Sequence, residues 1–256
     1  MLCLSVISHG QHTLAMRLLG CIARDRSPLV TRIVYTRNLP EAPLPPSITA
    51  IPGLEVIDNA APLGFGRNHN QAFGRCQEPF FCVLNPDIEW EHDPFPALLA
   101  CFDAPTKDPG LGLVAPLVRS PAGAIENTAR RLYTPAEMLA QKRRPRNAGA
   151  NADWLAGMFL LFGANAWRNI GGFDERYHLY IEDVDICTRL RLAGWQLAQC
   201  DTATVVHDAQ NQSHRSLRYT GWHLRGMLRY WTSPTFWRYR KSLLQLPEHG
   251  QVRERR

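Results

Sequence analysis

The sequence from 154 to 207 reads WLAGMFLLFGANAWRNIGGFDERYHLYIEDVDICTRLRLAGWQLAQCDTATVVH. An apolar run fills 154–167, and a glycine pair after it predicts a turn. Apolar side chains then recur at helical spacing within 182–195, and 197–208 predicts a strand that ends at His207. This stretch therefore predicts buried chain, turn, helix and strand in succession.

The part of the chain upstream of this stretch alternates in the same way. The patterns predict strands at 2–8, 32–36, 54–59, 80–90 and 111–120, helices at 11–23 and 62–76, and a proline-rich loop at 40–46. Short buried strands that alternate with helices predict an α/β fold with a mostly parallel, doubly wound sheet. Ligands of such sheets bind outside the carboxyl ends of the strands, and Asn85 to Asp87 follow one of these ends.

Composition excludes some classes of protein. With 256 residues and 45% hydrophobic residues, the chain can bury a sizeable core, which excludes a disordered protein. The net charge of +6 suits a phosphate-bearing ligand, an anionic membrane surface, or no particular partner. The seven cysteines contain no CxxC pair, which argues against a zinc ribbon and favours a reducing cytoplasm. No stretch approaches the roughly 20 apolar residues of a membrane span, so we expect a soluble or peripheral protein.

Three separate stretches carry groups that can perform chemistry. Asp87 follows a predicted strand, Glu182 and Asp183 begin a predicted helix, and His207 ends the last strand. Each has an ordinary alternative explanation, such as a turn residue or an acid at a helix N-terminus. A carboxylate with an imidazole also suits Mg²⁺ or Mn²⁺ chelated by a diphosphate, and a base such as Asp183 can deprotonate a hydroxyl.

Two basic stretches lie outside these groups. The tail at 213–246 is dense in arginine and aromatic residues and predicts an amphipathic helix with a basic face. That helix either packs on the domain or contacts a membrane surface, and no nucleic-acid-binding motif accompanies it. The loop sequence KRRPR at 142–146 either closes over a diphosphate, meets an acceptor phosphate, or is simply solvated.

The stretch at 154–213 resembles glycosyltransferase family 2, especially its bacterial rhamnosyltransferase-like branch. The blocks that match are AGMFLL, GGFDERY, YIEDVDICTRLRLAGW, His207 and Ser213, with VLNPDIEW and GFGRNHNQAF upstream, so the resemblance covers about residues 2–232. It implies a GT-A fold, in which helices flank a Rossmann-like, mostly parallel sheet. It also implies a nucleotide-sugar donor, a divalent metal (Mg²⁺ or Mn²⁺) and inversion at the anomeric carbon.

The resemblance also assigns roles to individual residues. Asp87 and His207 match the metal ligands, and Asp183 matches the catalytic base, with Glu182 as the alternative. Asn85 stands where the first acid of the metal motif usually stands. The expected donor-site residues are Ser8, Asp58, Gly64, Gly66, Asn70, Asn85 and Asp87, and the expected acceptor-site residues are Trp154 and Gly157. The ends of the first two strands depart from the family pattern, which leaves the nucleotide open.

The expected organisation is a GT-A domain at 1–212 and a basic, aromatic helical extension at 213–256. Within the domain, 1–118 is expected to bind the nucleotide-sugar and 119–212 to bind the acceptor and hold the catalytic groups. The expected reaction moves rhamnose or another deoxyhexose, with dTDP-rhamnose as candidate donor, to a lipid-linked or polysaccharide glycan precursor such as that of O-antigen. The expected location is the cytoplasm, with peripheral contact at the inner face of the membrane.

Two other functions stay open. The missing first acid also suits a non-catalytic relative that binds sugar or nucleotide as a scaffold in glycan synthesis. A nucleotidyltransferase shares the α/β donor-binding half, but its glycine-rich phosphate loop is not matched by the N-terminal VISHGQH.

Overall fold

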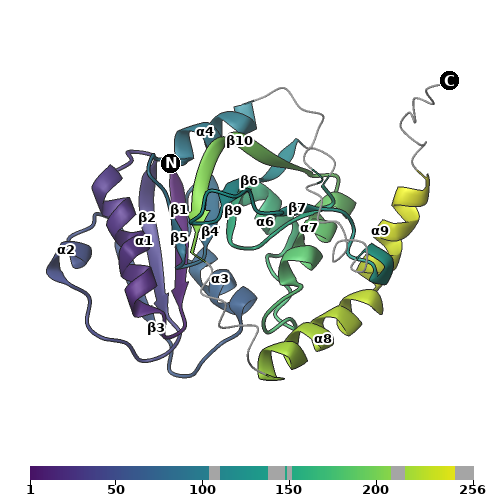
Figure 1. Cartoon of the computed structure of the whole chain (residues 1–256), viewed down its shortest axis with the longest axis horizontal. Coiled ribbons are helices and arrows are strands. Elements are labelled where there is room, and N and C mark those ends of the chain that lie inside the picture. Colours follow the sequence, from purple (N-terminus) through teal and green to yellow (C-terminus); the bar gives the residue numbers. More distant parts are fainter. Residues whose placement is uncertain (104–109, 138–147, 149–151, 209–216, 246–256) are drawn as a thin grey trace.

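The computed structural model describes residues 1–103, 110–137, 148, 152–208 and 217–245, and in these residues helices flank a central sheet (Figure 1). The sheet strands are β1 (Leu2–Ser8), β2 (Val30–Arg37), β3 (Leu54–Asp58), β4 (Phe80–Leu84), β5 (Ile88–Glu89), β6 (Leu111–Arg119), β9 (Phe159–Gly163) and β10 (Gln196–His207). Their order across the sheet is β3-β2-β1-β4-β9-β6-β10-β5, and β7 (Ala129–Arg130) pairs separately with β8 (Trp154–Leu155).

The sheet is mixed, with a parallel first half. Strands β3, β2, β1 and β4 run parallel, as do β6 and β10, whereas β9 lies antiparallel between β4 and β6. Every residue of β1 is buried, which is why its sequence does not alternate between apolar and polar residues. Its two serines, Ser5 and Ser8, are hydrogen-bonded to His69 and Glu41. The carboxyl ends of the four parallel strands meet at one edge of the sheet, where the predicted donor residues lie.

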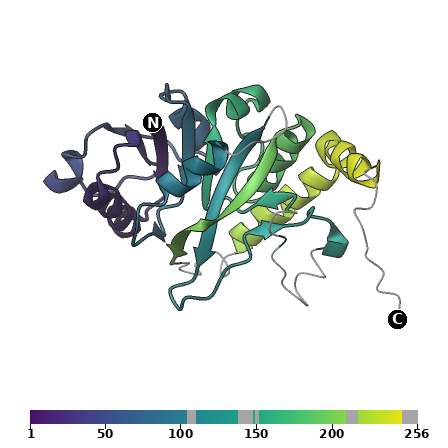
Figure 2. The same cartoon turned by 90° about the horizontal axis from the view of Figure 1, so that it is seen from above.

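Helices cover both faces of the sheet (Figures 1 and 2). They are α1 (His12–Asp25), α2 (Pro46–Thr49), α3 (Phe65–Phe73), α4 (Phe95–Ala100), α6 (Ala164–Ile170), α7 (Glu182–Leu192), α8 (Leu217–Trp231) and α9 (Pro234–Gln245), with a 3₁₀ turn at Cys101–Asp103. Successive side chains of β4 point to opposite faces. Cys82 and Leu84 join a core cluster with α1 and α4, and Phe81 and Val83 join a cluster with α3, α6 and α7. The predicted doubly wound arrangement is confirmed.

The tail differs from the single amphipathic helix that its pattern predicts. It forms two helices, because Ser233 and Pro234 end one and begin the next. The Ser233 hydroxyl accepts a hydrogen bond from the Phe236 N–H at 3.1 Å, and Pro234 occupies the first helical position. Both helices pack on the domain, since Tyr230 of α8 and Tyr239 of α9 are buried in the same core cluster as α7.

Two features that the sequence analysis singled out, the basic loop at 142–146 and Ser213, lie outside the residues that the structure describes. Among the helices that the structure describes, none has the length and apolar character needed to cross a bilayer.

Candidate active site

Asp87 and His207 meet at the carboxyl end of the sheet. Asp87 lies in the short turn between β4 and β5, and His207 is the last residue of β10. Antiparallel pairing places His207 opposite Ile88, and the Asp208 N–H donates to the Asp87 carbonyl at 2.9 Å. As a result, Nε2 of His207 lies 3.4 Å from Oδ2 of Asp87. The two residues are 120 positions apart in the chain, and two-residue strand pairing is what joins them.

A third group, Glu126, completes this cluster. Its Oε2 lies 3.1 Å from Nδ1 of His207, so the imidazole lies between two carboxylates. Burial lowers the pKa of His207, but hydrogen bonds and charge from Asp87 and Glu126 outweigh it and raise the pKa overall. Sequence reasoning missed Glu126 because it lies in a polar stretch that matches no motif. Its position depends on a backbone bond from the Glu126 N–H to the Val118 carbonyl at the end of β6.

The residues of this cluster fit a divalent cation. Oδ1 of Asp87 is buried and has no hydrogen-bond partner in the described part of the chain, so the carboxylate has an unused acceptor. A carboxylate oxygen and an imidazole nitrogen are ligands that Mn²⁺ accepts, and Mg²⁺ accepts the carboxylate. Glu126 would accept the proton on Nδ1 and so leave Nε2 of His207 as the ligand atom.

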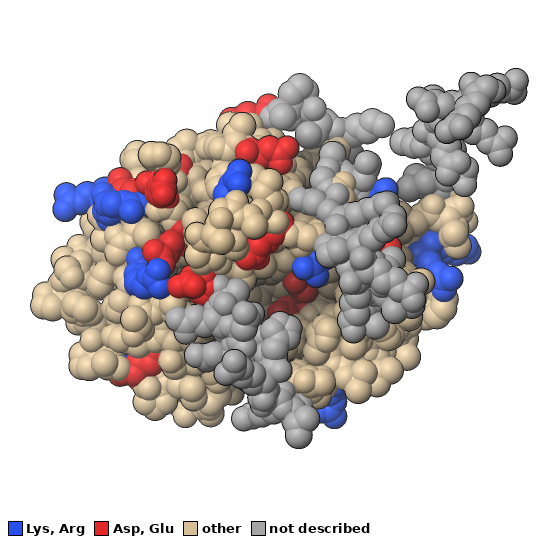
Figure 3. Space-filling model, in the orientation of Figure 1, with Lys and Arg blue, Asp and Glu red and all other residues tan. Residues whose placement is uncertain are grey.

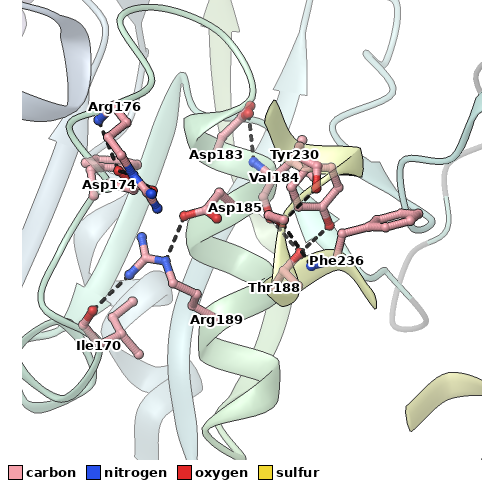
Figure 4. A network of polar contacts seen from close by, with 12 residues as sticks. Ile170, Asp174, Arg176, Asp183, Val184, Asp185, Thr188, Arg189, Tyr230 and Phe236 are labelled. Atoms are coloured by element: carbon pink, nitrogen blue, oxygen red, sulfur yellow. Dashed lines mark hydrogen bonds and ion pairs between the residues drawn. The ribbon is translucent and has the colours of Figure 1, made fainter. Parts of the chain in front are cut away.

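Asp183 is held at the start of α7 by a strained turn. Tyr180 and Ile181 have φ values of 70° and 72°, which are uncommon for residues other than glycine and most of all for a β-branched residue. Such strain costs about 1–3 kcal/mol per residue and persists only where packing imposes it. The turn directs Asp183 away from the helix, and its Oδ1 accepts from the Val184 N–H at 2.8 Å (Figure 4).

A three-residue segment, 156–158, links Asp183 to the Asp87 turn. The Gly157 N–H donates to Oδ2 of Asp183 at 3.1 Å. Its neighbour Met158 accepts a hydrogen bond from the Asn85 N–H at 2.9 Å, and the Ala156 N–H donates to the Thr128 carbonyl at 2.8 Å. Through these bonds the stretches around residues 85–87, 126–128 and 183 are all joined to the segment 156–158. The sequence predicts that Asp87, Asp183 and His207 meet, and it does not predict the part taken by 126–128. Figure 3 shows acidic side chains near the middle of this face.

Gly157 is required by the close approach of Asp183. A Cβ atom at position 157 would lie 3.2 Å from the Asp183 Cβ and 3.5 Å from Oδ2. Only glycine lets the backbone N–H approach the carboxylate this closely without displacing it. The expected acceptor-site residue Gly157 is thus placed directly against the candidate base.

The two neighbouring acids Glu182 and Asp183 differ in access. Glu182 is 5% exposed, and burial together with the charge of Asp183 raises its pKa well above the ordinary value. Asp183 is half-buried and bonded on both oxygens. Burial raises its pKa, while the N–H groups of Val184 and Gly157 and the charge of Arg130 oppose that rise. Asp183 is therefore the more accessible base of the two.

The remaining acid of this motif, Asp185, has a structural role. It is buried and paired with Arg189 at 2.7 Å, and Arg189 also donates to the Ile170 carbonyl at 2.8 Å (Figure 4). These contacts fasten α7 to α6. On the other side of α7, Thr188 shares a 2.7 Å hydrogen bond with Tyr230 of α8.

Trp154 is buried and packs against Arg130. Its ring is 5% exposed, and its Nε1 donates to the Arg131 carbonyl at 2.7 Å. The Arg130 guanidinium stacks over the ring with 5.1 Å between its carbon and the ring centroid. Contact of Trp154 with an acceptor stays a prediction, and the structure shows that Arg130 lies over one face of the ring.

Three expected donor residues fasten α3 to the 173–178 turn. A Cβ at Gly64 would lie 2.9 Å from the His178 carbonyl, and one at Gly66 would lie 2.7 Å from the Phe173 Cβ. The Asn70 amide donates to the Phe173 carbonyl and accepts from the Phe173 N–H, each at 2.9 Å. These contacts explain the residue types by packing, so a nucleotide contact for them stays a prediction.

Besides Asn85 and Asp87, two expected donor residues, Ser8 and Asp58, lie at strand ends, as expected. Ser8, the last residue of β1, is buried and donates from its hydroxyl to Glu41. Asp58 ends β3 and pairs with Arg37, with 2.7 Å between Nη2 and Oδ2. Ser8 ends the strand next to β4, and Asp58 ends the edge strand β3, two strands further from Asp87. A nucleotide contact for both residues stays a prediction.

Comparison with known proteins gives consistent relatives. No family model matches the chain. An N-acetylglucosaminyl-diphospho-decaprenol L-rhamnosyltransferase of Mycobacterium tuberculosis is 28% identical over 81% of this chain and 78% of the relative. Rhamnosyltransferase WbbL of Escherichia coli is 26% identical over 88% of this chain and 90% of the relative.

Solved structures share the fold at low sequence identity. GalNAc-T7, crystallised with UDP, GalNAc and Mn²⁺, matches with a TM-score of 0.62 and 16% identity over 81% of this chain, which spans 43% of that protein. Mannosyltransferase PcManGT from Pyrobaculum calidifontis, in complex with GDP-Man and Mn²⁺, matches with a TM-score of 0.58 and 12% identity over 97% of this chain and 76% of that protein.

Together, the solved structures show that the chain has the GT-A fold of glycosyltransferases. The two curated relatives that match most of the chain are both named rhamnosyltransferases, which is the branch that the sequence motifs resemble.

Proposed function

We propose that the chain transfers a sugar from a nucleoside-diphosphate donor to a hydroxyl of a lipid-linked glycan precursor, with inversion at the anomeric carbon. The observation that supports this proposal is that the segment 156–158 bonds both to Asp183 and to the turn that carries Asp87, which in turn pairs with His207. Rhamnose from dTDP-rhamnose is the proposed donor, because two relatives that match most of the chain are named rhamnosyltransferases.

Asp183 acts as the base in this proposal. A carboxylate oxygen takes the proton of the acceptor hydroxyl while the new bond forms at the anomeric carbon and the bond to the diphosphate breaks. A single displacement of this kind inverts the configuration. The raised pKa of Asp183 makes it a better proton acceptor than an ordinary aspartate, and the N–H groups of Val184 and Gly157 fix its orientation.

Asp87 and His207 would hold a divalent cation, either Mg²⁺ or Mn²⁺. When bound, the cation neutralises the charge on the departing diphosphate. The unused Oδ1 of Asp87 supports this assignment, and Glu126 would keep the His207 ring oriented. Asn85 contributes no carboxylate, so we expect weak cation binding until the donor diphosphate supplies further oxygens.

The two halves of the domain bind different substrates. In our proposal, residues 1–118 bind the nucleotide-sugar through Ser8, Asp58 and the 85–87 turn, and residues 119–212 bind the acceptor. The extension from residue 213 contacts the inner face of the membrane, where a lipid-linked acceptor is met. The exposed side chains of Leu224, Arg225 and Leu228 on α8 support this peripheral contact.

The test is transfer from labelled dTDP-rhamnose, alongside a panel of other nucleotide-sugars, to a polyprenyl-diphosphate-linked N-acetylglucosamine with Mn²⁺ or Mg²⁺. The Asp183→Asn variant should lose transfer by about 10²–10⁴-fold and keep nucleotide binding in a thermal-shift assay. Asp201→Asn, at an exposed position of β10, is the matched control. Nucleotide binding without any turnover in the wild-type chain would instead indicate the scaffold function.

A further inference from the structure

A cavity separate from the Asp87 cluster lies between residues 176–179 and helix α8. Its volume is about 390 Å³, and its lining includes Arg176, His178, Trp222, Arg225 and Arg229. The His178 and Trp222 rings contact each other with 4.5 Å between centroids, and they form an aromatic wall. Neither the sequence motifs nor the proposed chemistry assigns this cavity a role.

The cavity carries an excess of positive charge. Arg176 is neutralised by Asp174, with 2.6 Å between Nη2 and Oδ2. Arg225 and Arg229 make no ion pair with any carboxylate in the described part of the chain. They are four positions apart on α8, a spacing at which like charges repel and destabilise a helix. A dianionic ligand such as a phosphate or diphosphate would remove this repulsion and accept the planar donors of both guanidinium groups.

An apolar row runs beside the basic row on the same helix. Leu224 and Leu228 directly precede the two arginines and are 52% and 55% exposed. Leu224 and Leu228 are at i and i+4 and therefore lie on one stripe of the helix. Arg225 and Arg229 follow them by one position each, so they form a second stripe that runs parallel to the first. A charged row that borders an exposed apolar row fits an amphiphile that has an anionic head and a hydrocarbon chain.

The cavity adjoins the turn that carries the candidate base. Gly226, between the two arginines, also lines it. A Cβ at Gly226 would lie 3.0 Å from the Tyr180 carbonyl and 3.1 Å from Cγ1 of Ile181. Ile181 stands two positions before Asp183, so α8 packs directly against the strained turn.

From these observations we propose that the cavity binds the diphosphate of a polyprenyl-diphosphate acceptor through Arg225 and Arg229, with Leu224 and Leu228 against its chain. This inference rests on the proposed function, in which the acceptor is lipid-linked and Asp183 is the base. The cavity would anchor the acceptor by its phosphates and so bring the sugar hydroxyl to Asp183.

The test compares binding of the full chain to three kinds of vesicle: pure phosphatidylcholine, phosphatidylcholine with a polyprenyl diphosphate, and phosphatidylcholine with phosphatidylglycerol. The Arg225→Gln/Arg229→Gln variant should bind polyprenyl-diphosphate vesicles about thirtyfold more weakly, which is roughly fivefold for each arginine. The Arg238→Gln/Arg240→Gln variant loses the same charge from exposed positions of α9 and should change this binding less than about twofold. Inorganic diphosphate should compete with the vesicles.

Equal loss of binding in both double variants, or equal loss on phosphatidylglycerol vesicles, would overturn the proposal, because either result shows general attraction to a negative surface. Wild-type binding in the Arg225→Gln/Arg229→Gln variant would overturn it as well. The assay needs no turnover, so its result is separate from that of the transfer assay. A chain that transfers no sugar but loses vesicle binding as expected would retain the cavity assignment and reject the proposed reaction.

Discussion

Replacement of Gly157 by alanine tests whether the position of Asp183 controls the reaction. The added Cβ would lie 3.2 Å from the Asp183 Cβ, a separation that forces one side to move by a few tenths of an ångström. The 3.1 Å hydrogen bond from the Gly157 N–H to Oδ2 would then lengthen or tilt. Because a misplacement of about 1 Å costs about a hundredfold in rate, we expect kcat to fall about four- to tenfold.

The assay is steady-state transfer with donor and acceptor varied separately. We expect KM for the donor to stay within about twofold, because Gly157 lies against the base and not against the Asp87 pair. Gly20→Ala, in α1, is the control, since its added Cβ meets nothing within 4 Å. If Gly157→Ala kept full kcat, or raised only the donor KM, the assignment of Asp183 as the positioned base would be refuted.

The remaining predictions concern three other positions and the pH profile. Since burial raises the pKa of Asp183, the base form is lost as pH falls through that raised value, so log kcat should decline on an acidic limb above the ordinary aspartate range. Asp183→Asn should remove that limb, and a limb that persists would point to another group. Glu126→Gln should weaken Mn²⁺ activation about 10–100-fold by releasing His207, as measured by activity against metal concentration; unchanged activation would rule out this orienting role. Gly226→Ala should lower stability by about 1–3 kcal/mol, seen as a reduced Tm, because the added methyl overpacks the turn at Ile181; an unchanged Tm would show that the turn yields at no cost.

The sequence located most of the sheet because buried parallel strands have continuous apolar runs. The run LCLSVIS is β1 from Leu2 to Ser8, and the apolar run before Asn85 is β4. The same motifs also named Asp87, His207 and Asp183, since each stands directly at the end of an element. Element ends are where a side chain leaves the core, so periodicity marks them well.

Several features of the site that the sequence did not reveal depend on contacts between residues far apart in the chain. Glu126 was missed because only its loop conformation brings it to His207, and its neighbours follow no period. The packing of Asn70 against Phe173 could not be seen, since it joins residues 103 positions apart. The break at Ser233 was overlooked because aromatic and basic residues continue on both sides of it, although the serine-proline pair is itself a helix-start signal.

The most direct test of the account is a calorimetric titration of Mn²⁺ into the chain with dTDP present, in the wild type and in two variants. We expect Asp87→Asn to lose metal-dependent nucleotide binding, and Asp183→Asn to bind metal and nucleotide as the wild type does although it transfers sugar about 10²–10⁴-fold more slowly. Unchanged Mn²⁺ binding in Asp87→Asn, or loss of it in Asp183→Asn, would contradict the division of this site into a cation pair and a separate base.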